Sequence, residues 1–137
     1  MTRASPAQPG VTAVVVADAD GMICYWNRGA EALTGHPAAT AARSSLDLIV
    51  PPEYRPRHWA GFRAAMASGS ARFEGASANI PVLCADGAVR RWPGRFTLIR
   101  DARGTPAGAA AVLVTPAEGD PPLFDLYRAR PAQGRTG

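Results

Sequence analysis

His58 is the residue whose type and position best suit it to bind a ligand. It belongs to an apolar stripe with helical spacing, made of Tyr54, His58, Phe62, Ala65 and Gly69. Successive helical residues are about 100° apart, so this spacing places the imidazole in the middle of one helix face, pointing inward. An imidazole facing an apolar cavity is a suitable axial ligand for haem iron, because its nitrogen binds iron and the porphyrin needs an apolar slot.

Other side chains near His58 are candidates for binding the same cofactor. Arg57 and Arg63 fall on other sides of the helix, where they can reach solvent or an anionic group at the cavity rim. Met66 lies about 80° around the helix from His58 and could line the pocket, although such a methionine more often serves packing. The predicted cofactor-binding residues are Met66, Ile80, Phe96, Phe62, Arg57 and Trp59, with His58 as the metal ligand.

The cysteines and the second histidine have plainer interpretations. Cys24 and Cys84 are expected to be free thiols, and Cys84 to be a small core residue of a strand. Thiolate ligation or redox sensing by Cys84 is the alternative. His36 follows Gly35 in a predicted loop, so we expect it to be solvated, with a distal or second-metal role as the alternative.

A hairpin and a short helix are expected before the helix of His58. Apolar, β-branched runs at Val11–Ala17 and Met22–Trp26 flank the turn residues Asp18–Gly21, which predicts two paired strands. Asn27 suits the N-cap of a helix, and Gly35 supplies its stop. The sequence up to position 45 therefore predicts strand, strand and short helical turns.

The helix of His58 and three further strands follow. Pro56 fits the first turn of that helix, and Gly69 fits just beyond its end. The strand candidates Ala78–Ala85, Val89–Arg100 and Pro106–Thr115 are separated by short turns, which favours antiparallel pairing. This order predicts an α+β fold, in which helices cover one face of a five-stranded antiparallel sheet and a ligand cavity lies between them.

Composition and motifs exclude several classes of function. The 137 residues are 47% hydrophobic and 19% charged, which is typical of one globular domain. No apolar run approaches the roughly 20 residues that span a bilayer, and the first residues lack a signal peptide, so a cytoplasmic location is expected. The 15 basic residues, all arginine, form no stripe interleaved with aromatic residues, which disfavours nucleic-acid binding. No nucleophile elbow, phosphate loop or metal-binding Cys/His spacing is present, so no enzymatic activity is expected.

Three segments are expected along the chain. Residues 1–10 read as a flexible leader, residues 11–116 as the folded domain, and residues 117–137 as a tail rich in proline and glycine. The tail contains one apolar patch, Leu123–Tyr127, which could dock on the domain, on a second copy or on a partner. A stand-alone sensor of this kind would signal through a partner protein or a homodimer.

Three parts of the sequence together resemble a PAS domain. They are VVVADADGMICYWNRGAEALTGH, LDLIVPPEYRPRHWAGFRAAMASG and the hairpin at Asp86–Gly87, and the resemblance extends from Val11 to Thr115. It implies the PAS fold described above. PAS domains share a shape while they serve different signals, so the function must be argued from a site.

The segment Arg55–His58 resembles the proximal-histidine helix of haem-PAS oxygen sensors of the FixL type. This resemblance implies haem b held through His58 and a response to a diatomic gas or to redox state. The sequence departs from that family at Ala78, where the family has an arginine that steadies bound oxygen, and at Ala64, where it has an arginine that pairs with haem propionate. Carbon monoxide, nitric oxide or redox sensing therefore fit better than stable oxygen binding.

The alternative is a haem-free PAS module that binds a partner protein or a small metabolite. Many PAS domains without haem resemble this sequence in carrying a histidine after an arginine in this helix, where the histidine serves the core. Flavin photosensing is disfavoured, because the Asn-Cys-Arg-Phe-Leu motif of light-sensing relatives is missing. The two hypotheses share the same cavity and differ in what His58 does there.

Overall fold

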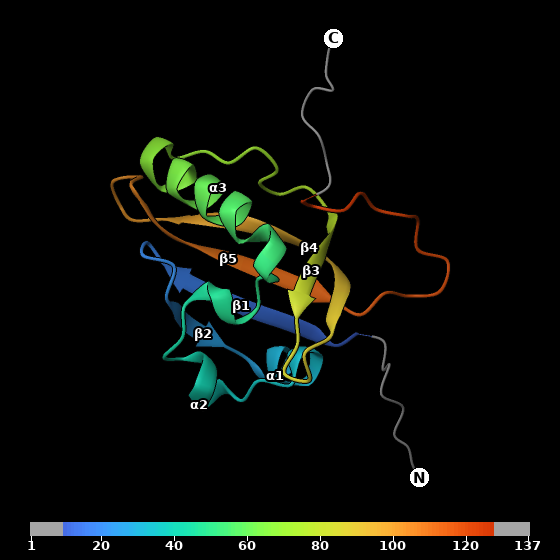
Figure 1. Cartoon of the computed structure of the whole chain (residues 1–137). Helices are drawn as coiled ribbons and strands as arrows, with labels where there is room; N and C mark the ends of the chain where they lie inside the picture. Colours follow the sequence, from blue (N-terminus) through green and yellow to red (C-terminus); the bar gives the residue numbers. More distant parts are fainter. Residues whose placement is uncertain (1–9, 128–137) are drawn as a thin grey trace.

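The computed structural model describes residues 10–127, in which five strands form a sheet and one long helix lies over a face of it (Figure 1). Residues 1–9 of the predicted leader and 128–137 of the predicted tail lie outside the described residues. The strands are β1 (Thr12–Asp18), β2 (Ile23–Trp26), β3 (Ala78–Leu83), β4 (Val89–Arg100) and β5 (Pro106–Val114). The helices are α1 (Arg28–Thr34), α2 (Ala38–Ala41) and α3 (Arg55–Ser68), with 3-10 turns η1 (Leu46–Leu48) and η2 (Pro52–Tyr54) between α2 and α3.

The five strands form one antiparallel sheet in the order β2-β1-β5-β4-β3. The last strand pairs with the first, so β5 lies in the centre of the sheet, and β2 and β3 form its edges. This confirms the predicted α+β fold with a five-stranded antiparallel sheet. Strand β3 ends at Leu83, two residues before the predicted end, because the backbone of Cys84 and Gly87 already bonds in the turn to β4.

Asn27 connects α1 to the sheet. Its side-chain oxygen accepts hydrogen bonds from the backbone N–H of Ala30, at 2.9 Å, and of Val14, at 2.8 Å. Its amide nitrogen donates to the carbonyl oxygen of Thr12. Asn27 therefore caps the helix, as predicted, and also fastens the helix beside β1. Gly35 ends α1 with a φ of 83°, a left-handed conformation that glycine adopts without strain.

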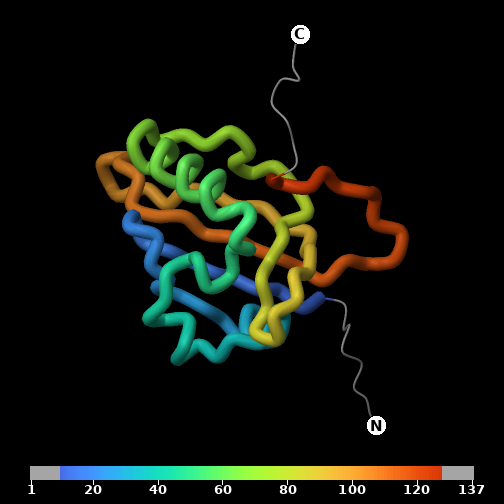
Figure 2. Tube along the Cα trace, in the orientation of Figure 1, coloured from blue at the N-terminus to red at the C-terminus, as the bar shows by residue number. Residues whose placement is uncertain are grey.

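Helix α3 crosses the sheet above β5, and the tube in Figure 2 follows it from η2 to the loop that leads to β3. Gly69 ends it with a φ of 81°, as the sequence predicts. The buried core lies mostly between the sheet and α1, and it includes Trp26, Leu33 and Leu113. Within the described residues, Ala65 is the one buried residue of α3. The sheet beneath α3 is therefore covered without being tightly packed.

Two helical glycines give a matched test of this packing. In α1, a methyl group on Gly29 would overlap the backbone carbonyl oxygen of Thr12, whereas at Gly61 in α3 it would meet only open space. We expect Gly29→Ala to lower the free energy of unfolding by about 1–3 kcal/mol through overpacking. Gly61→Ala is expected to raise it by about 0.5–1 kcal/mol, because alanine favours helix. Urea denaturation measures both, and equal effects of the two substitutions would contradict the packing described.

Candidate ligand-binding cavity

A cavity of about 430 Å³ lies between the sheet and α3. Its floor is built from side chains that alternate along the strands and meet across them, since Val15 pairs with Ala111 and Ala111 with Phe96. A second row joins Ala17, Ala109 and Leu98 in the same way. The floor and the wall toward β3 comprise Val15, Ala17, Ile80, Val82, Phe96, Leu98, Ala109, Ala111 and Leu113.

The cavity exists because small residues face each other across it. The central strand β5 contributes Ala109 and Ala111 to the floor, directly below α3. In α3, Gly61 lines the cavity without a side chain, and it has no heavy atom within 4 Å of the position of a Cβ. Larger residues at these three positions would fill the volume that a helix on a sheet normally buries.

His58 lies in the cavity wall, on the face of α3 that turns toward the sheet. Its ring is surrounded by aromatic rings, with centroid distances of 4.7 Å to Trp59, 5.9 Å to Phe62 and 6.4 Å to Tyr127. The Nδ1 atom is buried and has no hydrogen-bond partner among the described residues. Nε2 is therefore the nitrogen through which His58 can meet a molecule in the cavity.

Burial keeps the imidazole of His58 neutral. Loss of hydration lowers the pKa of His58 from 6.5 to about 4, and the nearby carboxylate of Asp47 opposes this shift only in part. Asp47 is already engaged, because it accepts a hydrogen bond from Trp59 Nε1 at 2.7 Å and lies 3.6 Å from Arg55 Nε. At neutral pH His58 is thus an uncharged group that can accept or donate one hydrogen bond.

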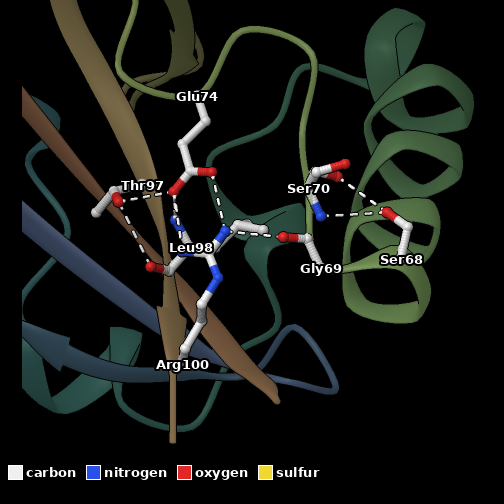
Figure 3. A network of polar contacts seen from close by, with 7 residues as sticks. All are labelled: Ser68, Gly69, Ser70, Glu74, Thr97, Leu98 and Arg100. Atoms are coloured by element: carbon white, nitrogen blue, oxygen red, sulfur yellow. Dashed lines mark hydrogen bonds and ion pairs between the residues drawn. The ribbon is translucent and has the colours of Figure 1, made fainter. Parts of the chain in front are cut away.

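The loop after α3 forms one rim of the cavity, and Glu74 fastens it to β4 (Figure 3). The Glu74 carboxylate accepts hydrogen bonds from the backbone N–H of Leu98, at 2.7 Å, and from the hydroxyl of Thr97, and it pairs with Arg100. Arg100 also donates to the carbonyl oxygen of Gly69, at the end of α3. The Leu98 N–H first, then Arg100 and Thr97, lower the pKa of Glu74 to about 2, so the network is intact at neutral pH.

Comparison with known protein families identifies this architecture. A family model described as the PAS fold matches residues 11–113. The chain belongs to the PAS family. It is therefore a sensor-type domain, of a family whose members commonly bind small ligands and signalling partners.

Individual relatives of this PAS domain share its fold at low sequence identity. A PAS domain from Colwellia psychrerythraea has a TM-score of 0.65 and 21% identity, over 77% of this chain and 86% of that one. The PAS domain of the quorum-sensing receptor RpfR from Cronobacter turicensis, solved in complex with BDSF, has a TM-score of 0.58 and 15% identity, over 79% of this chain and 96% of that one. An uncharacterised protein of Azorhizobium caulinodans is 32% identical over 97 residues, which span 70% of this chain and 13% of that relative.

The predicted cofactor-binding residues separate into two groups in the PAS domain. His58, Phe62, Ile80, Phe96 and Arg57 line the cavity. Met66 and Trp59 are absent from its lining. The Trp59 side chain is directed away by its bond to Asp47, and its ring packs on Gly21 in the β1–β2 turn, where any Cβ would overlap it. Arg63 lies over the same ring, 6.0 Å from its centroid.

Sequence reasoning missed several lining residues. Ala109 and Ala111 could have been found, because a run of small residues in a predicted strand indicates space above it. Arg72, in the rim loop, carried no local signal. Leu126 and Tyr127 line the cavity from the predicted tail, which shows that the Leu123–Tyr127 patch docks on the domain itself, the first of the three options that the sequence left open.

The second histidine and the buried cysteine lie away from the cavity. The prediction that His36 is solvated is wrong, because its ring is half-buried and packs edge-on against Trp26 with a centroid distance of 6.4 Å. Cys84 is 4% exposed, next to the carbonyl oxygen of Leu33, as expected of a small core residue. Among residues 10–127, no three His, Cys, Asp or Glu side chains gather as a metal site, and no helix is long and apolar enough to span a membrane.

The half-buried, neutral imidazole of His58 predicts how stability depends on pH. The unfolded chain binds a proton on His58 near pH 6.5 but the folded chain only near pH 4, so stability is full above pH 6.5 and is lost as pH falls toward 4. Between pH 7.5 and pH 5 we expect the free energy of unfolding to drop by about 2 kcal/mol on account of His58. In His58→Leu this part of the drop should vanish. Urea denaturation at both pH values tests it, and an unchanged slope in the variant would contradict a neutral, buried His58.

Proposed function

We propose that this PAS domain is a sensor module that binds a small, mostly apolar organic molecule in the cavity beneath α3. The observation that supports this most strongly is the cavity itself, whose 430 Å³ lie in the range of about 300–1,000 Å³ typical of small-molecule sites. Its floor and roof are almost entirely aliphatic or aromatic. Apolar ligand surface buried there would supply most of the binding free energy.

The charges at the cavity favour a ligand with an anionic or neutral polar end. Arg57 and Arg72 are the ionised side chains in the lining, and no acidic side chain joins them among the described residues. Neither arginine makes an ion pair with another described residue. A carboxylate or sulfonate near either guanidinium gains a charge-assisted hydrogen bond, whereas a cationic ligand would be repelled.

Occupation of the cavity would be passed on to a partner protein or to a homodimer in the cytoplasm. The RpfR PAS domain, which has a similar fold, was solved with BDSF bound, and this supports a ligand-binding role for the fold. What the present chain binds has to be argued from its own lining. That lining calls for a molecule with an apolar body and at most one anionic end.

The position of Gly61 in the roof gives a direct test with 8-anilinonaphthalene-1-sulfonate, an aromatic anion, as the probe. Gly61→Phe should place a ring in the cavity and weaken probe binding by at least about ten-fold. Gly61→Ala, which adds a single methyl group, should bind within about three-fold of wild type. Fluorescence titration measures the three affinities, and circular dichroism verifies that each protein is folded. Equal binding by wild type and Gly61→Phe would contradict the proposed site.

Haem b is the second candidate ligand, and one observation favours it. His58 presents a neutral imidazole from an apolar wall, which is the donor that haem iron requires of a protein. Bound haem would supply a metal that takes up carbon monoxide or nitric oxide, or that changes oxidation state. In this chain His58 would hold it, Phe62, Ile80 and Phe96 would exclude water, and Arg57 would offer the charge for a propionate.

Small organic ligands rank first because they require only the cavity, whereas haem requires more of His58. A metal-binding histidine almost always donates its second ring N–H to an oxygen acceptor, which orients the ring. Nδ1 of His58 has no such partner among the described residues. The haem hypothesis therefore depends on an imidazole oriented by packing against aromatic rings alone.

An absorption spectrum of protein purified with haem supplied distinguishes the two candidates. If His58 binds haem, the wild type shows an intense Soret band, His58→Ala loses it, and Met66→Leu, altered outside the lining, keeps it. An uncoloured wild type would eliminate the haem proposal and leave the organic-ligand proposal intact.

A further inference from the structure

The edge of the sheet at β3 has three outward-facing positions, and none of them leaves an N–H group unpaired. The backbone N–H of Leu83 donates to the carbonyl oxygen of Ile49, at 2.9 Å. Pro81 has no N–H to offer. Asn79 bonds outward to the segment Leu123–Tyr127, which we name the latch. An exposed strand edge invites pairing with other chains, so the latch completes the protection of this edge.

Among the described residues, the backbone of the latch bonds to the sheet at a single residue, Asn79. The N–H of Asn79 donates to the carbonyl oxygen of Phe124, at 2.8 Å, and its carbonyl oxygen accepts from the N–H of Leu126, at 2.9 Å. The Asn79 side chain also donates to the carbonyl oxygen of Leu123, at 3.3 Å. Asn79 and Asp125 thus form one isolated parallel bridge, and Figure 2 shows this end of the described chain beside the start of β3.

Side chains of the latch pack on residues that line the cavity or flank α3. Phe124 packs on Phe73 of the rim loop, with ring centroids 5.3 Å apart. Tyr127 stacks on Tyr54, before α3, with ring centroids 5.1 Å apart and planes inclined by 19°. The latch therefore contacts both the rim loop and the start of α3. Leu126 and Tyr127 are part of the cavity lining, so the ligand volume is complete only when the latch is seated.

The attachment of the latch allows it to move without disturbing the sheet. Residues 116–122, which lead from β5 to the latch, are all exposed. The one backbone–backbone hydrogen bond within them is donated by the N–H of Asp120 to the carbonyl oxygen of Ala117 in their own turn. Among the described residues, opening the latch would break the bonds to Asn79, the ion pair between Arg91 and Asp125, and the ring contacts of Tyr127 with Tyr54 and His58 and of Phe124 with Phe73. Segments with so few anchors open at a lower free energy than the sheet they rest on.

We propose that the latch Leu123–Tyr127 opens as a unit and gates the cavity, so that ligand enters when the latch leaves β3 and is enclosed when it returns. The inference rests on the proposed function, because a gate requires a ligand to admit. It makes the latch the element whose position reports on the cavity. Its seated and released states differ at Asn79, at Tyr54 and at the edge of the sheet, all of which a partner can contact.

Hydrogen exchange tests whether the latch opens on its own, with no ligand needed. The amides of Asn79 and Leu126 should exchange at least about 100-fold faster than those of Ile80 and Val82, which belong to the β3 positions paired with β4. Nuclear magnetic resonance of the full chain resolves these amides. Equal rates for both pairs would mean that the latch opens only with the sheet, and would overturn the proposal.

A reversible lock tests gating. Asn79 of β3 and Asp125 of the latch are partners in a β-bridge, and bridge partners lie about 4.8 Å apart, within reach of a disulfide. The variant Asn79→Cys/Asp125→Cys is made in a Cys24→Ser background, because Cys24 is exposed. When it is oxidised, uptake of anilinonaphthalene sulfonate in stopped-flow fluorescence should slow by at least about ten-fold, and dithiothreitol should restore it. The reduced form of the same protein serves as the matched control.

The outcomes distinguish failure of the gate from failure of the ligand site. Equal uptake rates in the oxidised and reduced forms would overturn the gate while the ligand site stands. Slow uptake only in the oxidised form supports both the gate and the ligand site. Absence of probe uptake in the wild type and in the reduced variant would count against the proposed function, and the gate would fall with it.

Discussion

The space above Ala109 and Ala111 is the constraint on which the rest of this structure depends. These alanines lie on the central strand, where a helix crossing the sheet would normally meet valine or leucine. Gly61 of α3 also lines the cavity and carries no side chain to fill it. The fold tolerates the gap because its core is built elsewhere, between the sheet and α1, where Asn27 fastens helix to strand. Val15, Val82 and Leu113 belong to both the core and the cavity lining, so the packed region and the ligand site adjoin each other on the same sheet.

The ionisable groups inside the cavity are uncharged, and the charged groups lie at its rim. Burial would normally be offset for a histidine by a carboxylate partner, but Asp47 is occupied by Trp59 and Arg55, so His58 stays neutral. Burial likewise raises the pKa of the Tyr127 hydroxyl. The positive charges remain at the rim, on Arg57 and Arg72, where water hydrates them. A ligand can therefore bury its apolar body in the cavity without also burying a charged protein group that has no partner.

The sequence predicted the fold well because its signals are local. Turns at Asp86–Gly87 and at positions 101–104, the cap at Asn27 and the stop at Gly69 each determine one boundary from neighbouring residues. Helical periodicity likewise predicted that His58 and Phe62 face the sheet. Trp59 follows His58 directly, about 100° further around the helix, and its direction was decided by a hydrogen bond to a distant residue.

What the sequence could not predict depends on contacts between distant positions. Asn79 and Leu123 are 44 residues apart, and no local pattern indicates that one polar side chain on an edge strand would hold the tail. The pairing of β1 with β5, which sets Ala111 beside Val15, is equally non-local. The candidate site was therefore predicted where one helix builds it and missed where the sheet register and the latch build it.

The coupling between ligand and latch depends on how the ligand fills the volume. A molecule that fits within the 430 Å³ touches Leu126 and Tyr127 only when the latch is seated, so its contact energy favours the closed state. A longer molecule would occupy the place of Tyr127 and favour the open state. By linkage, anything that holds the latch seated strengthens binding of the first kind of ligand and weakens binding of the second. Ligand binding can thus shift the latch either toward its seated state or toward its open state, and the length of the ligand decides which.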